Sequence, residues 1–197
     1  MLEERKLKEA EKRVKQYVSD GIISAKGKPE HMAFFLKNAD DSIDSAKALL
    51  EISTDPEKQK FLGFTSFNGL LWAVNASYYS MFYMARALLE NEGLKIKIDL
   101  SVHAVTFDTL VSHFYLTGKL QKGLLDDFVE AKEDAAELLG KQKADELIEE
   151  YFYEKKKRGT FTYEMGEILV KSKAKTSLER AQRFRREIKK IIIKNNK

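Results

Sequence analysis

Apolar residues recur along almost the whole chain at steps of three and four, the period of an amphipathic helix. The stripe is clear in residues 30–52, where Phe35, Ala39, Ile43, Ala46 and Leu50 fall on one side. The same period recurs in residues 2–20, 68–91, 102–115, 120–157 and 176–194. No segment alternates convincingly with period two, so we expect no sheet. The pattern predicts an all-α protein.

Glycine and proline clusters separate these helical segments. The breaks fall at Gly27-Lys28-Pro29, Ser53-Thr54-Asp55-Pro56, Gly93, Thr117-Gly118 and Arg158-Gly159-Thr160, and Gly140 is a possible bend. Residues 68–91 are the most apolar helix, which we place at the centre of a bundle. No repeat or linker divides the chain. We therefore expect one domain over residues 1–197, with an N-terminal helix in residues 1–28 and a bundle in residues 30–194.

Composition narrows the possible chemistry. The 197 residues are 43% apolar and 34% charged, and they contain no cysteine, which excludes disulfides and thiol nucleophiles. His31, His103 and His113 lack the spacing of a zinc site, so we expect no metal and no cofactor. Residues 67–89 are interrupted by polar side chains, and the chain does not begin like a signal peptide. We expect a cytoplasmic protein that does not enter a membrane.

Charge is spread unevenly. Residues 126–150 hold ten acidic and three basic side chains, a net charge of −7. Residues 171–197 hold eleven basic and two acidic side chains, a net charge of +9. This asymmetry indicates either an anionic partner, such as a phosphate backbone, or two segments that pack against each other. In the first case, solvated lysines such as Lys189 and Lys190 would add mainly long-range attraction.

Residues 72–89 read WAVNASYYSMFYMARALL. The tyrosine pair Tyr78-Tyr79, the following Met-Phe and the later Ala-Leu-Leu resemble the signature of small prokaryotic HEPN-domain proteins. The likeness continues through Gly93, His103 and the Thr117-Gly118 element, and then through an arginine and a tyrosine, here Arg158 and Tyr163. The extra N-terminal helix and the long acidic segment depart from the family pattern.

The resemblance implies an antiparallel helical bundle that forms a homodimer and binds nucleotides or RNA. It also implies a nucleotidyltransferase-like protein partner, and some relatives are RNases of toxin–antitoxin systems. Those nucleases carry an arginine followed four to six residues later by a histidine. In this chain Tyr163 stands in the place of that histidine. A tyrosine has an ordinary pKa of about 10 and is a poor general base near neutral pH, so we assign no catalytic residue.

Arg158 and Tyr163 are the first candidates for binding a phosphate, because a guanidinium offers paired N–H donors. In the alternative interpretation, Arg158 is only a cation at a helix end that Gly159 caps. Tyr78, Tyr79, Arg86 and His103 are further candidates for a nucleotide site. Each has a simpler structural explanation: core packing for the tyrosines, a side chain reaching water for Arg86, and a local hydrogen bond for His103.

The sequence therefore favours a HEPN-like nucleotide- or RNA-binding domain. Two alternatives stay open. One is a divergent RNase that uses Arg158 with Tyr163. The other is a helical interaction module without a small ligand.

Overall fold

The computed structural model describes residues 4–25, 29–97, 102–152 and 160–195, and within these ranges it describes side chains except those of residues 139–168 and 195. Within these residues the fold is mostly helical, which confirms the all-α prediction. The elements in chain order are α1 (Glu4–Ser19), β1 (Ile23–Ser24), α2 (Met32–Thr54), α3 (Pro56–Phe61), α4 (Leu70–Asn91), β2 (Lys95–Ile96), α5 (Val102–Leu110), the π-helical turn η1 (Val111–Tyr115), α6 (Lys122–Phe152) and α7 (Thr160–Asn195).

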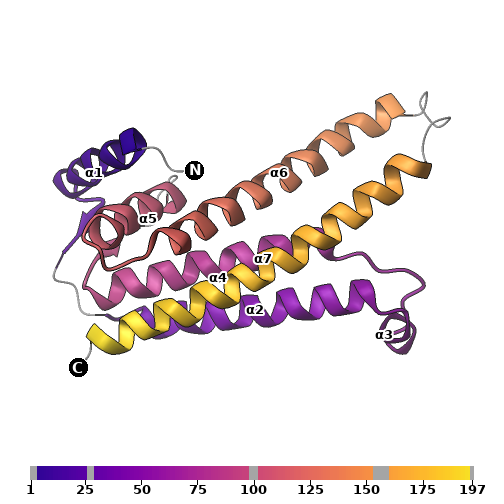
Figure 1. The fold of residues 1–197 in the computed structure, drawn as a ribbon, viewed down its shortest axis with the longest axis horizontal. Helices are drawn as coiled ribbons and strands as arrows, with labels where there is room; N and C mark the ends of the chain where they lie inside the picture. The colour runs from indigo at the N-terminus through magenta and orange to yellow at the C-terminus, as the bar shows by residue number, and fades with distance from the viewer. Residues whose placement is uncertain (1–3, 26–28, 98–101, 153–159, 196–197) are drawn as a thin grey trace.

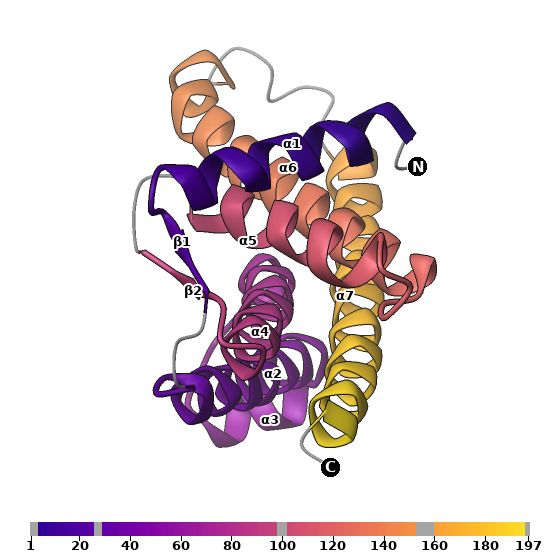
Figure 2. The same cartoon turned by 90° about the vertical axis from the view of Figure 1, so that its left-hand side faces the viewer.

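Helix α4 is the centre of the bundle, as its apolar sequence predicts. It packs against α2, α5, α6 and α7, so its side chains are covered on several sides (Figures 1 and 2). Met81, Ala85, Leu88 and Leu89 are fully buried. The helix ends at Asn91, and Gly93 follows with a φ of 74°, which glycine adopts at little cost. The Leu94 N–H then donates to the Leu89 carbonyl at 2.9 Å, which closes the end of the helix.

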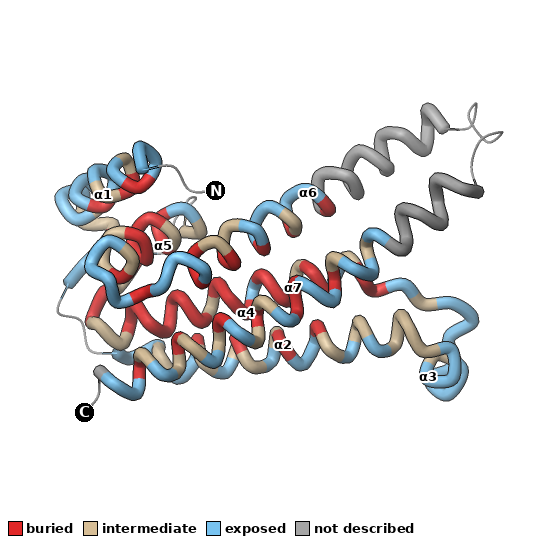
Figure 3. The backbone as a smooth tube through the Cα atoms, viewed as in Figure 1, coloured by how far each residue is buried: buried red, intermediate tan, exposed pale blue. Residues whose placement is uncertain are grey.

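The hydrophobic core joins α1 to the bundle. Leu7, Ala10 and Val14 of α1 are buried in the same cluster as Phe114 and Phe128 (Figure 3). Helix α1 lies against α5 and η1, so the N-terminal helix covers one end of the bundle (Figure 2). Val18, in the last turn of α1, is instead 47% exposed.

The prediction of no sheet is wrong at one place. β1 and β2 form a two-residue antiparallel pair, with Ile23 opposite Ile96 and Ser24 opposite Lys95. A pair this short has no detectable period in the sequence, because an alternating pattern needs about four residues or more. The pair connects the chain after α1 to the chain after α4.

Two helix boundaries also differ from the prediction. Residues 53–56 end α2 as expected, but Asp55 then caps a new short helix, α3. Its carboxylate accepts from the Glu57 and Lys58 N–H groups, and Pro56 occupies the first helical position. Helix α7 begins at Thr160 rather than near residue 176. The sequence signal is weak there because residues 160–175 mix polar and apolar side chains without a clear stripe.

Candidate ligand-binding site

The acidic and basic segments pack against each other. Arg183 of α7 makes a paired contact with the buried carboxylate of Asp127 on α6, with Nε 2.7 Å from Oδ2. Arg180 contacts Asp134 at 3.0 Å and also pairs with Glu130. Lys173 lies 3.1 Å from Asp134. Of the two interpretations of the charge asymmetry, the structure shows internal pairing for these side chains.

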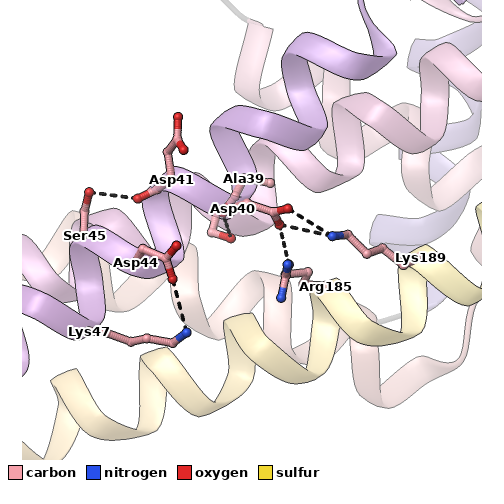
Figure 4. Close-up of polar contacts among 9 residues, drawn as sticks. Ala39, Asp40, Asp41, Asp44, Ser45, Lys47, Arg185 and Lys189 are labelled. Carbon is pink, nitrogen blue, oxygen red and sulfur yellow. Dashed lines mark hydrogen bonds and ion pairs between the residues drawn. The ribbon is translucent and has the colours of Figure 1, made fainter.

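A second group of ion pairs connects α7 to α2. Arg185 and Lys189 both contact Asp40, and the Lys189 Nζ lies 3.1 Å from Oδ2 (Figure 4). Partial burial alone would raise the pKa of Asp40, but hydrogen bonds from the two cations hold that pKa below its ordinary value. Lys190 contacts Glu187 at 2.9 Å. Lys189 is therefore held in an ion pair between helices, whereas Lys190 is exposed, as expected, and makes only a surface pair on its own helix.

The first candidate pair falls largely outside the described part of the chain. Arg158 lies outside the described residues. Tyr163 belongs to the helical backbone of α7, but its side chain lies outside the described side chains. The pairing of these residues stays a prediction.

The two adjacent tyrosines of α4 have different surroundings. Tyr78 is buried, and its hydroxyl lies 2.8 Å from Nδ1 of His103 in the first turn of α5. The His103 ring stacks on Phe82, with ring centres 4.1 Å apart and an interplanar angle of 27°. Tyr79 is 36% exposed. The structure therefore brings Tyr78 and His103 together in an aromatic cluster, and Tyr79 packs against both from the surface side.

The Tyr78–His103 contact is suited to holding α5 on α4. Burial raises the pKa of the Tyr78 phenol. Burial also lowers the pKa of His103, and the positive charges of Lys132 and Arg86 lower it further. Both side chains are therefore neutral near pH 7. His103 therefore makes a hydrogen bond to another helix rather than the local hydrogen bond that we expected at a helix start.

Arg86 does not reach out to water. Its side chain is only 5% exposed, and its guanidinium carbon lies 4.7 Å from the centre of the Phe35 ring. Its Nη2 donates to the Ile96 carbonyl at 3.3 Å. Burial lowers the pKa of Arg86, and the charge of Glu90 opposes that shift. A guanidinium stays charged even so, which makes this a buried cation on the central helix.

A cavity of about 500 Å³ lies beside Arg86. Its walls come from α4, from the start of α2 and from the strand pair, and they consist of Ser24, His31, Phe34, Phe35, Arg86, Glu90, Lys95, Ile96 and Lys97. Glu90 is 2% exposed, and its Oε2 atom accepts no hydrogen bond from the described residues. This cavity combines aromatic rings, several cations and a buried carboxylate.

Sequence reasoning identified Arg86 but missed the other residues of this cavity. Glu90 carries a detectable signal, since it follows Arg86 by four residues in the most apolar helix. Lys95 and Lys97 carry none, because the short strand pair that positions Lys95 has no recognisable pattern.

A second, shallower groove of about 350 Å³ lies between α2 and α4. Its aromatic residues are Trp72, Tyr79 and Tyr83, and Trp72 is 51% exposed. Trp72 and Tyr79 are seven residues apart and lie along one side of α4. This groove is an exposed aromatic surface.

Comparison with known proteins finds no match: no family model, no curated protein and no solved structure is significantly similar to the chain. Within the described residues, no group of three or more histidine, cysteine or acidic side chains is placed to hold a metal ion. The described helices include none that is long and apolar enough to span a membrane.

Proposed function

We propose that this protein is a HEPN-like nucleotide- or RNA-binding domain and that the ligand binds in the cavity beside Arg86. The observation that carries the proposal is a buried arginine, stacked on an aromatic ring, at the wall of a cavity of about 500 Å³. Cavities of roughly 300–1,000 Å³ accommodate small-molecule and cofactor ligands. Burying a charged side chain is unfavourable unless other polar groups replace its lost water, and a bound polar ligand would be such a group.

The side chains around the cavity match the two halves of a nucleotide. Phe34 is 59% exposed at the wall and offers a ring face on which a base can stack. Lys97 is exposed and Lys95 is half-buried beside it, so both supply positive charge for phosphate oxygens. Arg86 adds planar N–H donors on the inner side.

The same geometry supports binding over catalysis. An RNase that acts near neutral pH needs a side chain that exchanges protons with its substrate. His103 is engaged with Tyr78 at 2.8 Å and stacked on Phe82, and it does not line the cavity. A divergent, toxin-like RNase that uses Arg158 with Tyr163 in the place of the histidine stays the alternative proposal.

We also propose a homodimer, on the family resemblance and on the groove of Trp72, Tyr79 and Tyr83. Exposed aromatic side chains in a groove are typical of protein–protein contacts. Sedimentation at micromolar concentration should show a dimer, and Trp72→Ser should weaken it. A strict monomer would contradict this proposal.

A nucleotidyltransferase-like partner rests on the resemblance alone, and co-purification of such a protein with the chain would support it.

Calorimetric titration with nucleoside monophosphates and a short single-stranded RNA tests the ligand proposal. Arg86→Met keeps most of the stem volume but removes the cation, and we expect it to weaken binding about tenfold or more. Lys97→Gln, which changes only an exposed side chain, should weaken binding less. Arg186→Ala removes an exposed cation of α7 that does not line the cavity, so this control variant should bind like the wild type. If the wild type binds neither ligand at low salt, the proposal fails and an interaction module is the better account.

A further inference from the structure

We propose that the cavity beside Arg86 recognises guanine, with Glu90 accepting hydrogen bonds from the base and Arg86 donating one to it. This inference rests on the proposed nucleotide-binding function and names the base that the site selects. The ligand chemistry is a guanine base, presented either by a free nucleotide or by single-stranded RNA.

Glu90 is the observation that points to a ligand. Its side chain is 2% exposed, it lines the cavity, and Oε2 accepts no hydrogen bond from the described residues. A buried carboxylate oxygen without a donor is unfavourable, because it has lost its water and gained no replacement. A ligand that carries N–H donors would satisfy it. Glu90 is the acidic side chain among the residues that line the cavity.

Arg86 and Glu90 together present a donor beside an acceptor. They are four residues apart on α4, so their side chains lie on the same side of the helix. Arg86 uses Nη2 for the Ile96 carbonyl, and a guanidinium has five N–H donors in total. Glu90, as a carboxylate, only accepts. The wall of the cavity therefore carries donors next to acceptors along the axis of α4.

Guanine is the base whose edge matches this order. Its O6 atom accepts, and its neighbouring N1–H and 2-amino groups both donate. Adenine has the reverse arrangement, with an amino donor beside the N1 acceptor, and would set its amino group against Arg86. Cytosine offers one amino donor and then two acceptors, and uracil has a single N–H between two acceptors. A carboxylate can accept two parallel N–H bonds from one planar partner, as it does from a guanidinium.

The remaining side chains fit the rest of a guanine nucleotide. The Phe34 and Phe35 rings lie edge to face with centres 5.5 Å apart, so the exposed face of Phe34 is available for the base. Lys95 is held by Glu30 at 2.7 Å, which orients it at the cavity. His31 and Lys97 are exposed at the same site and can meet the phosphate.

The test compares GMP, IMP and AMP by calorimetric titration. IMP keeps O6 and N1–H but lacks the 2-amino group, so it loses one hydrogen bond to Glu90. We expect IMP to bind about tenfold more weakly than GMP, and AMP about a hundredfold more weakly, on the order of one charged hydrogen bond for each step. Glu90→Gln is nearly isosteric and should reduce the preference for GMP over AMP to about tenfold or less. Glu133→Gln makes the same change at an exposed position of α6, so this matched control should keep the wild-type preference.

The outcomes separate this inference from the function on which it rests. Equal binding of GMP and AMP, both weakened by Arg86→Met, would support a nucleotide site and overturn the guanine assignment. Binding of no nucleotide and no RNA would overturn both. An unchanged preference in folded Glu90→Gln would also overturn the assignment. If that variant does not fold, the GMP and IMP affinities of the wild type decide. A single-stranded RNA hexamer with one guanosine, compared with its inosine counterpart, shows whether RNA is the source of the base.

Discussion

The ionisation of His103 is set by its surroundings. Its ring lies between Phe82 and Tyr78, and its pKa is lowered first by burial and then by the charges of Lys132 and Arg86. The lowered pKa means that His103 takes up a proton less readily in the folded state than in the unfolded state. At pH values below the ordinary pKa of about 6.5, the unfolded state therefore binds more protons than the folded state. In neutral His103, Nδ1 can either accept a hydrogen bond from the Tyr78 hydroxyl or donate one to it, depending on the tautomer.

We therefore expect the free energy of unfolding to decrease as the pH falls from 7 to 5. The contribution of His103 to the free energy of unfolding is fully present above the pKa that it has in the unfolded state. That contribution is lost as the pH falls from this value to the lower pKa of the folded state. His103→Gln should make this decrease smaller, as measured by urea denaturation at each pH. Burial also lowers the pKa of His113, so part of the decrease should remain. His31→Gln is the control at an exposed position, and an identical pH profile for wild type and His103→Gln would contradict the prediction.

At the scale of elements, α1 is fastened to the bundle by an ion pair as well as by its apolar stripe. Arg13 contacts the buried Asp108 of α5 with two hydrogen bonds of 2.7 Å, and the Tyr17 hydroxyl donates to the same carboxylate at 3.3 Å. The side chain of Asp108 is 3% exposed, whereas that of Arg13 is 47% exposed. The carboxylate is thus the group that depends on the contact.

Arg13→Ala should lower the free energy of unfolding by about 1–3 kcal/mol, because it leaves a buried carboxylate with only Tyr17 as a partner. The value lies below that of a fully buried pair, since water reaches Arg13. Arg5→Ala is the matched control: its pair with Glu9 on the same helix is exposed, and its loss should cost about 0–0.5 kcal/mol. Chemical denaturation measures both. If the two variants lose equal free energies of unfolding, the contact of Arg13 with Asp108 does not stabilise the packing of α1 on the bundle.

The elements that the sequence predicted are those long enough to repeat a pattern. Helix α4 runs for 22 residues, and its stripe could be seen directly. Helix α3 has six residues and depends on the Asp55 cap, and the β1–β2 pair has two residues on each side. The strand pair forms because long-range packing brings its two segments together, which periodicity does not record, whereas α3 has no buried residue and forms through its local cap.

At the scale of the whole molecule, the candidate site was only partly predictable. The sequence identified Arg86, because an arginine in an apolar helix is conspicuous. It missed Lys95 and Lys97, which come to the cavity only through the strand pair, and it missed Phe34, which lies beside the buried Phe35 on α2. Tyr78 and His103 were candidates for a nucleotide site with core packing and a local hydrogen bond as the simpler explanations, and the structure places Tyr78 in the core with its hydroxyl on His103.

The distribution of ion pairs over the molecule leads to a prediction about salt. Arg180, Arg183 and Lys189 of α7 are engaged with carboxylates of α6 and α2. A side chain already paired within the protein releases few counterions from a nucleic acid when it binds. Of the lysines that line the cavity, Lys95 is itself paired with Glu30, and Lys97 is exposed.

The affinity for single-stranded RNA should therefore depend only weakly on salt. With about two phosphate contacts, from Lys95 and Lys97, a logarithmic plot of affinity against salt between 50 and 200 mM should have a slope of about −1.5 or shallower. Lys97→Gln should make the slope shallower by about 0.7, because one contact is lost. Lys189→Gln with Lys190→Gln, the control for α7, should keep the wild-type slope, and Asp40 keeps Arg185 as its partner in that variant. A steep slope, of about −4 or beyond, that this double variant reduces would instead identify α7 as the surface that follows the phosphate backbone, and the cavity would then hold at most one nucleotide of a longer bound strand.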